Sequence, residues 1–340
     1  MEVRDTLDGK LVFNIELPVL DQWDFKVFDV IPQGKVIKLE TDVGSKCLEI
    51  RTLSPNAVFR IFLMSEHLSQ HGLKRIPRFI RTRYGEPYIK TGKGYYWVSD
   101  WFHGRPVNYQ DQNDMVKSAR KLAEFHMASK GFYLPGEEEA TYHQNYRGIK
   151  FLNMACQIVD LKSQIRKPAF FRESLRIMAE RMIYAAKILT GSGYGQLREK
   201  YKKEQGFCHG AFNRDHLIMG NSGEVYLTGL SHWNRDIRLW DLTDFLFSVG
   251  QENQWDRQLF QKIITNYHQI CPLLPLEMNF LQGYLFFPFG YWELLQDLAQ
   301  KNAGGEETKD RLAAYWEQEE KKEKCLIDLW KLKEGMLGGW

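Results

Sequence analysis

Residues 207–247 read FCHGAFNRDHLIMGNSGEVYLTGLSHWNRDIRLWDLTDFLF, and this stretch decides the fold. It opens with a His209-Gly210 turn and a short loop, and a strand–turn–strand pattern follows. A second turn then leads into a helix that carries Asp241-Leu242 in its first turn. The order of these elements predicts a loop displayed between a turn and a hairpin, with a helix behind it.

Length and charge limit the classes of protein to which the chain can belong. Its 340 residues indicate about two domains or one bilobal unit. The net charge of +3 is nearly balanced, which argues against a dedicated nucleic-acid binder and against a polybasic membrane anchor. The first residues lack the apolar run of a signal peptide, and no stretch is apolar over about 18 residues. We expect synthesis in the cytoplasm and no membrane insertion.

The cysteines point to neither a metal site nor a disulfide framework. They are odd in number, widely scattered and without a CxxC pair. The spacing predicts buried free thiols in a reducing compartment. The five residues are Cys47, Cys156, Cys208, Cys271 and Cys325.

The first hundred residues predict a small antiparallel sheet with one helix. A strand–turn–strand pattern lies within residues 23–53, and a helical pattern runs from Pro55 to Gly72. Three more strand candidates follow at residues 78–83, 88–91 and 94–102. We therefore expect an N-terminal lobe over residues 1–102.

The rest of the chain is predicted to be helical except for residues 207–247. Gly191–Gly195 is predicted to be a flexible break between helices. The expected fold is α+β and bilobal, with a helical C-terminal lobe over residues 103–340 and a ligand cleft between the lobes. Helical patterns span residues 114–129, 149–163, 170–189, 255–271, 275–292, 294–303 and 308–332.

Several motifs carry a resemblance to a known superfamily. They include His71-Gly72-Leu73, the segment Trp101–Arg105, Leu122–His126, His209-Gly210 and Asp241-Leu242. The chain resembles the aminoglycoside/choline phosphotransferase branch of the protein-kinase-like fold, and within it the CotS-like spore coat family. The resemblance implies a bilobal kinase-like fold, synthesis in the mother cell, deposition in the spore coat, and other spore coat proteins as partners.

The departures from the active branch fall on the positions that carry its chemistry. The resemblance implies a loop H-G-D-x-x-x-x-N and a later metal-binding Asp, but Ala211, His216 and Gly229 stand at these three positions. Glu49 aligns with the strand lysine, where it would repel phosphate and a helix Glu66. Mg²⁺ is held in such sites by carboxylate and amide oxygens. We therefore predict a degenerate catalytic site, a pseudokinase with no cofactor and no metal.

Two residual candidates for chemistry remain in the loop, namely His209 and Asp215. The simpler interpretation is that His209 bonds loop backbone and that Asp215 is a turn or cap residue. Asp241 is interpreted as a structural acid in the first turn of its helix. Lys46 or Arg51 could supply the cation that the strand lysine normally provides.

Three hypotheses for the function follow from these residues. The first is a catalytically inactive coat protein with a structural or assembly role. The second is a divergent phosphotransferase that uses Asp215, with His216 beside it. The third is a nucleotide- or metabolite-sensing pseudokinase that binds its ligand through the backbone near Ser99, Asp100 and Trp101. ATP and Mg²⁺ enter only under the second and third.

Overall fold

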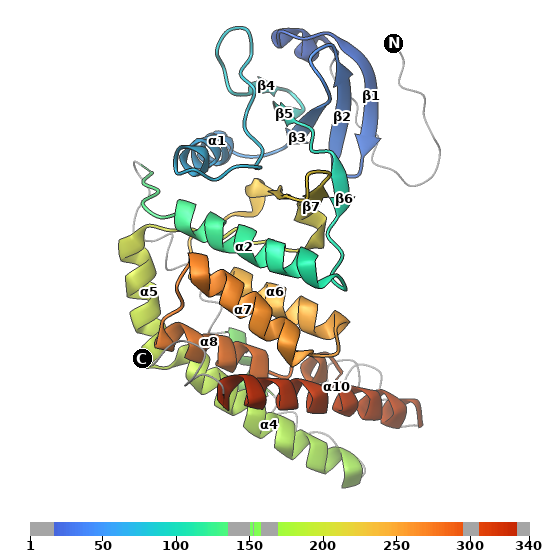
Figure 1. Ribbon diagram of the computed structural model, residues 1–340, viewed down its shortest axis with the longest axis vertical. Coiled ribbons are helices and arrows are strands. Elements are labelled where there is room, and N and C mark those ends of the chain that lie inside the picture. The colour runs from blue at the N-terminus through green and yellow to red at the C-terminus, as the bar shows by residue number, and fades with distance from the viewer. Residues whose placement is uncertain (1–16, 135–149, 152, 158–168, 295–305, 332–340) are drawn as a thin grey trace. The chain divides into compact units, whose positions relative to one another are not determined.

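The computed structural model describes residues 17–134, 150–151, 153–157, 169–294 and 306–331 (Figure 1). The chain divides into two compact units. The first contains residues 1–106 and 218–231, and the second contains residues 107–217 and 232–340. Each unit has a core of its own, and each is described separately below.

The first unit contains an antiparallel sheet of five strands in the order β1-β2-β3-β5-β4. Every pairing within it is antiparallel, and Glu49 of β3 lies opposite Trp97 of β5. The predicted small sheet with one helix, α1 (Pro55–Gln70), is confirmed. The strands are β1 (Val27–Gln33), β2 (Val36–Thr41), β3 (Lys46–Arg51), β4 (Ile89–Thr91) and β5 (Gly94–Asp100).

Alternation of apolar residues explains how the sheet forms its core. Ile37, Leu39 and Leu48 point to one face, where they pack around the fully buried Trp23. The Trp23 indole donates its N–H to the carbonyl of Ile80 at 2.8 Å. Beside the sheet, α1 begins at Ser54, whose hydroxyl accepts the Ala57 N–H at 3.2 Å and so caps the helix.

Two features of the first unit differ from the sequence predictions. Residues 78–83 do not form a strand, since they make only an isolated bridge between Ile80 and Val98. Strand β1 was not predicted, because most of its residues are exposed or half-buried and the alternation of apolar residues is weak. The unit also holds a second sheet in the order β6-β7-β8, with β6 (Gly104–Pro106), β7 (Leu217–Gly220) and β8 (Val225–Leu227).

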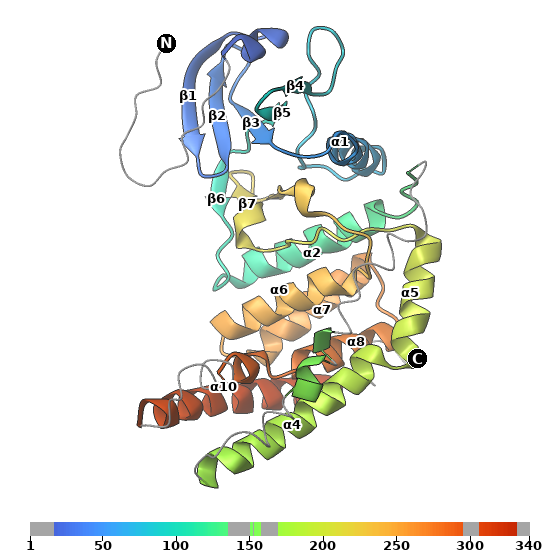
Figure 2. The same ribbon diagram turned by 180° about the vertical axis from the view of Figure 1, so that it is seen from behind.

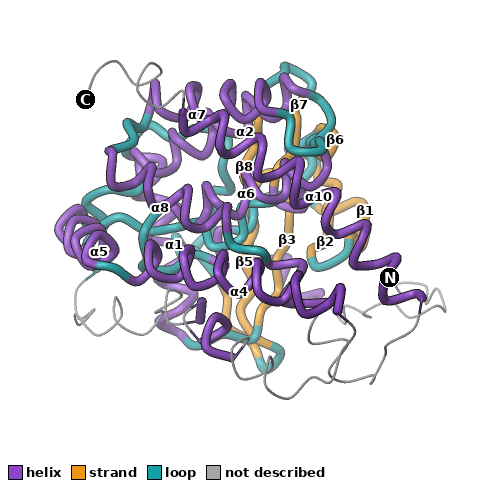
Figure 3. The backbone as a smooth tube through the Cα atoms, turned by 90° about the horizontal axis from the view of Figure 1, so that it is seen from below, coloured by secondary structure: helices purple, strands orange, loops and turns teal. Residues whose placement is uncertain are grey.

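The second unit is helical. Helix α2 packs along α7, α4 packs along α8, and α10 lies against both α7 and α8 (Figures 2 and 3). The helical predictions that fall on described residues are confirmed for these elements and for α6, whereas residues 294–303 and most of 149–163 lie largely outside the described part. The bounds are α2 (Gln112–Ala128), α4 (Ala169–Thr190), α5 (Ser192–Glu204), α6 (Leu239–Glu252), α7 (Arg257–Ile270), α8 (Pro275–Phe286) and α10 (Glu306–Lys331).

The predicted break at Gly191–Gly195 is limited to Gly191, which separates α4 from α5, and residues 192–195 are helical. Gly191 is the N-cap of α5, and the helix buries Tyr194, Leu197 and Tyr201 on one face. The burial of two tyrosines and a leucine outweighs the low helix propensity of the glycines in the first turn.

The five cysteines are free thiols, as predicted. Their predicted burial holds for Cys208, Cys271 and Cys325, while Cys47 is half-buried. It is wrong for Cys156, which lies on the solvent-exposed side of a helical segment. In the part of the chain that the structure describes, no helix combines the length and apolar character needed to span a membrane.

Candidate functional site

The loop that opens with His209-Gly210 lies in the second unit. Cys208 and Asn234 exchange two backbone hydrogen bonds, of 2.9 Å and 3.2 Å, which hold the start of the loop beside the turn before α6. Gly210 has a φ of +81°, and a Cβ atom there would lie 2.2 Å from the carbonyl oxygen of His232. The position therefore requires glycine both for its left-handed backbone and for the close approach of another chain segment.

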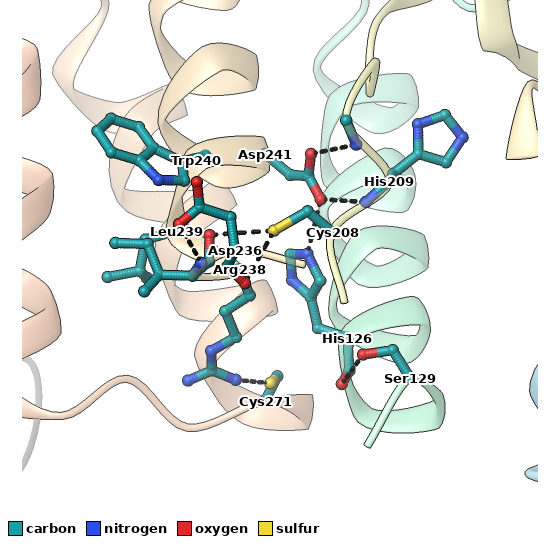
Figure 4. A network of polar contacts seen from close by, with 12 residues as sticks. His126, Ser129, Cys208, His209, Asp236, Arg238, Leu239, Trp240, Asp241 and Cys271 are labelled. Carbon is teal, nitrogen blue, oxygen red and sulfur yellow. Dashed lines mark hydrogen bonds and ion pairs between the residues drawn. The ribbon is translucent and has the colours of Figure 1, made fainter. Parts of the chain in front are cut away.

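The buried carboxylate of Asp241, in the first turn of α6, anchors this loop (Figure 4). Its Oδ2 accepts the backbone N–H of His209 at 2.6 Å, and its Oδ1 accepts that of Gly210 at 2.9 Å. The Nε2 atom of His126, on α2, lies 3.1 Å from Oδ2. Its Nδ1 lies 2.7 Å from the Tyr267 hydroxyl on α7. One carboxylate thus ties the loop to three helices.

The protonation states of this network follow from burial and hydrogen bonding. Burial alone would raise the pKa of Asp241, but the hydrogen bond and charge of His126 and the Gly210 N–H lower it below its ordinary value. Burial lowers the pKa of His126 further than Asp241 raises it. Asp241 is therefore an anion beside the neutral imidazole of His126. This imidazole donates a hydrogen bond from Nε2 to Asp241 and accepts one at Nδ1 from the Tyr267 hydroxyl.

A second buried network joins the start of α6 to α5 and α8. Arg238 donates to the Tyr201 hydroxyl at 2.7 Å, to Glu277 at 2.9 Å and to the Pro272 carbonyl at 2.8 Å. Its guanidinium also donates to the Cys271 sulfur (Figure 4). Burial raises the pKa of Glu277, but Arg238 and the other donors lower it further, so the pair is ionised. A buried pair of this kind fixes geometry more than it adds stability.

The positions that should carry catalysis surround a short turn after Gly210. Ala211 offers only a methyl group where the resemblance implies a carboxylate. Asn213 caps the 3₁₀ turn Arg214–His216, because its Oδ1 accepts the Asp215 N–H at 3.0 Å. Asp215 itself is exposed, and its carboxylate forms no hydrogen bond or ion pair with other described residues. Asp215 is thus within a turn, and the cap is Asn213.

The two histidines of the loop lie in different surroundings. His209 is fully buried, accepts the Ala211 N–H at Nδ1 over 3.3 Å, and packs edge-on against the ring of Phe125 at 5.7 Å. These contacts favour the structural interpretation of His209. His216 is half-buried, with ring centroids 5.9 Å from His209 and 5.1 Å from His232.

The other two positions implied to carry catalysis, Gly229 and Glu49, belong to the first unit, whereas the loop that opens with His209 belongs to the second. Gly229 has a φ of +75° and no side chain to ligate a metal. Glu49 accepts the Arg51 guanidinium at 3.1 Å, and Lys46 donates to Asp100 at 2.7 Å. Each of the two candidate cations is therefore already paired with a carboxylate.

The two glutamates of the predicted repulsion, Glu49 and Glu66, each pair with a cation in the first unit. Glu66 of α1 pairs with Arg78 at 3.0 Å, while Glu49 has its own arginine on the same strand. Each carboxylate is thus paired with a nearby arginine. The Arg51 guanidinium allows β3 to carry Glu49 at the position where a lysine is expected.

The proposed ligand-contacting backbone lies at the end of β5. Ser99 is buried and pairs with Cys47 in the strand register, and Asp100 pairs with Lys46. The Trp101 N–H donates to the Ser45 carbonyl at 3.1 Å. The Trp101 N–H is thus already used in a backbone hydrogen bond just beyond the paired strands β3 and β5.

The donor set does not fit a magnesium nucleotide. At the three positions the side chains are a methyl group, an imidazole and a hydrogen, and none carries the oxygen that Mg²⁺ prefers. Among described residues, no group of three or more His, Cys, Asp and Glu side chains is placed to hold a metal ion.

The anchors of the loop were the residues that sequence reasoning did not identify. His126 and Tyr267 lie 115 and 26 residues from Asp241 along the chain, so their contacts could not be read from local patterns. One signal was available in the Leu122–His126 motif, which places a histidine on the apolar face of α2. Arg238 lies in the segment leading into α6 and carried no comparable signal.

The two units and the anchored loop define the aminoglycoside phosphotransferase-like fold, and the bilobal kinase-like prediction is confirmed. The chain superposes with a TM-score of 0.80 on the aminoglycoside phosphotransferase from Alicyclobacillus acidocaldarius subsp. acidocaldarius DSM 446, over 96% of this chain and 98% of that one, at 18% identity. Spectinomycin phosphotransferase gives 0.52 at 12% identity, covering 91% and 95%. The amicoumacin kinase hAmiN gives 0.51 at 15% identity, covering 91% and 93%.

Sequence comparison adds a similarity to spore coat proteins. Residues 196–329 match the family described as "Spore coat putative kinase YutH". The chain is also 26% identical to Spore coat protein S of Bacillus subtilis (strain 168) over 262 residues, which is 75% of this chain and 74% of that protein. The resemblance to the CotS-like spore coat family, a branch of the kinase-like superfamily, is confirmed.

Proposed function

We propose that the chain is a kinase-fold protein of the spore coat that binds other coat proteins during assembly and transfers no phosphate. In this proposal it is made in the mother-cell cytoplasm and deposited in the coat. One observation carries it: the loop is held in place by Asp241, while Ala211, His216 and Gly229 stand where the chemistry belongs. A fold that only binds partners needs the support of this loop but not the reactive groups at these positions.

Phosphoryl transfer requires a carboxylate at the acceptor, oxygens around the metal and a cation on the phosphates. Ala211 removes the first, and the donor set described above supplies none of the second. The cations Lys46 and Arg51 are paired with Asp100 and Glu49. The proposal therefore includes no nucleotide and no metal as a working cofactor.

A divergent phosphotransferase is the second candidate, because the matched family is described as a "putative kinase" and because the exposed Asp215 carboxylate forms no hydrogen bond or ion pair with described residues. Asp215 lies four residues beyond Ala211, in the 3₁₀ turn Arg214–His216. In this candidate its carboxylate orients the acceptor hydroxyl, and His216 lies next to it. A nucleotide-sensing role through Ser99, Asp100 and Trp101 has less support, because the Trp101 N–H already donates to the Ser45 carbonyl.

Asp215 separates the two candidates in sporulating cells. A strain that makes the Asp215→Ala chain, expressed at the wild-type level, is compared with the wild type and with a deletion strain. Coat proteins extracted from purified spores are quantified by mass spectrometry. The assembly role predicts that the deletion strain loses a subset of coat proteins and that Asp215→Ala restores the full set. Loss of the same subset in Asp215→Ala would favour the phosphotransferase.

A further inference from the structure

A cavity of about 520 Å³ lies in the second unit between the first turns of α6 and the end of α8. Its size is typical of ligand sites, which span roughly 300–1,000 Å³. None of its described lining residues belongs to the loop 207–217, so it is a feature separate from the degenerate site. The residues used below are Phe151, Trp240, Asp244, Tyr284, Trp292 and Glu293.

The walls of this α6–α8 cavity are aromatic and tightly interlocked. The rings of Phe151 and Trp240 stack with centroids 5.8 Å apart and planes 5° from parallel. Tyr284 meets Phe151 edge-on at 5.6 Å and Trp240 at 5.8 Å. Trp292 is buried and adds another indole to the lining. Ring faces are electronegative, so a rigid aromatic wall attracts a cation.

Carboxylates complete the cavity. Asp244 lies one helical turn after Trp240 on α6, and the Tyr284 hydroxyl donates to its Oδ1. Glu293 is exposed and lines the solvent-facing side, where Lys150 is exposed as well. Two carboxylates and one ammonium give the described lining a formal charge of −1. The described lining thus combines aromatic rings with a net negative charge.

We infer that the α6–α8 cavity receives the guanidinium group of an arginine side chain from a partner polypeptide. A planar guanidinium stacks on aromatic rings and has five N–H donors for carboxylates, so it suits a lining of aromatic rings and two carboxylates better than an ammonium does. The exposed Glu293 and Lys150 leave the solvent side charged, so a peptide backbone remains in water while its side chain enters.

Arginine is also enriched among the anchors of protein interfaces, which cluster in well-packed pockets that exclude water. The site goes beyond the proposed coat role, since it stands whether or not the loop 207–217 transfers phosphate. It gives that role a specific chemistry of partner recognition: a polypeptide that presents an exposed arginine.

The test uses the full chain and a pair of peptides. The capped peptide Gly-Gly-Arg-Gly-Gly is titrated into the protein and followed through the indole N–H signals of its ¹⁵N-labelled tryptophans. Trp240→Phe and Trp292→Phe assign two of those signals. The same peptide with citrulline, the neutral isostere of arginine, is the matched control. We expect the Trp240 or Trp292 signal to shift with the arginine peptide and at least about tenfold weaker binding of the citrulline peptide.

Three variants locate the site. Asp244→Asn keeps an oxygen that can accept from Tyr284, and Glu293→Gln changes an exposed residue, so both are expected to fold. Each should weaken arginine-peptide binding by about threefold to tenfold. Glu180→Gln on α4 removes an exposed carboxylate away from the cavity lining and should leave the affinity unchanged.

Four results would overturn the inference. These are equal binding of the two peptides, no shift of either tryptophan signal, unchanged affinity in both Asp244→Asn and Glu293→Gln, or tighter binding of agmatine than of the arginine peptide. The last would identify a site for small guanidinium compounds in place of a protein partner.

Discussion

Replacing Asp241 by asparagine is the most informative change to the scaffold of the loop. The buried carboxylate receives two backbone N–H groups, from His209 at 2.6 Å and Gly210 at 2.9 Å, and lies 3.1 Å from Nε2 of His126. Asparagine keeps the shape but presents an N–H₂ group to at least one of these donors. A hydrogen bond to a buried charge is worth about 1.5–3 kcal/mol, and an unsatisfied buried donor costs about 1–3 kcal/mol.

From these terms we expect Asp241→Asn to lower the free energy of unfolding by about 3–5 kcal/mol. That is a large share of the roughly 5–15 kcal/mol that a typical protein has. The assay is urea unfolding at pH 7, followed by circular dichroism and by tryptophan fluorescence. Asp215→Asn is the matched control, because that carboxylate is exposed and makes no hydrogen bond or ion pair with described residues; its midpoint should equal that of the wild type.

The reasoning would be refuted by an Asp241→Asn variant that unfolds within about 0.5 kcal/mol of the wild type, since that is the usual range for surface substitutions. The pH dependence gives a second check. The folded pKa of Asp241 is depressed, so its contribution to stability is present above the unfolded pKa and is lost as pH falls through the folded pKa. The stability difference between Asp241→Asn and the wild type should therefore shrink in acid.

Three further predictions concern the same framework. Gly210→Ala should lower the unfolding free energy by at least about 1–2 kcal/mol, because alanine is strained at a φ of +81° and its Cβ would overlap the His232 carbonyl; an unchanged urea midpoint would contradict this. Burial depresses the folded pKa of His126, so the free energy of unfolding should fall as pH drops below about 6.5. His126→Gln should reduce this dependence of the unfolding free energy on pH between about pH 7 and 5. An equal pH dependence in the variant and the wild type would exclude His126 as its source. Removing one partner of the buried Arg238–Glu277 pair by Glu277→Gln should cost about 3–5 kcal/mol in the same assay, and a loss below about 1 kcal/mol would show that the pair is not desolvated as described.

The elements that sequence reasoning identified are those with strong local patterns. The amphipathic stripes of α2 and α7 and the turn at His209-Gly210 were evident from periodicity and from glycine chemistry. Strand β1 was missed because its exposed residues break the alternation, and α5 was missed because glycines open a helix that burial stabilises.

The loop's support could not be predicted, because it depends on contacts between distant residues. Asp241 was expected to be a structural acid in its first helical turn, and it does lie there. That it also holds His209 and Gly210, and is backed by His126, follows only from the packing of α2, α6 and α7. The resemblance implied which groups are missing at Ala211, His216 and Gly229, and the residue types alone show that these side chains carry no oxygen.

The central claim is the absence of phosphoryl transfer, and a direct assay of γ-phosphate transfer tests it. The purified full-length chain is incubated with [γ-³²P]ATP and Mg²⁺ or Mn²⁺, together with spore coat extract or with a panel of hydroxylated small molecules, and an active aminoglycoside phosphotransferase serves as the positive control. We predict no incorporation and no ATP hydrolysis above those of a heat-denatured sample. Labelled product that is formed by the wild-type chain and lost in the folded Asp215→Ala variant would contradict the account and identify a phosphotransferase that uses Asp215.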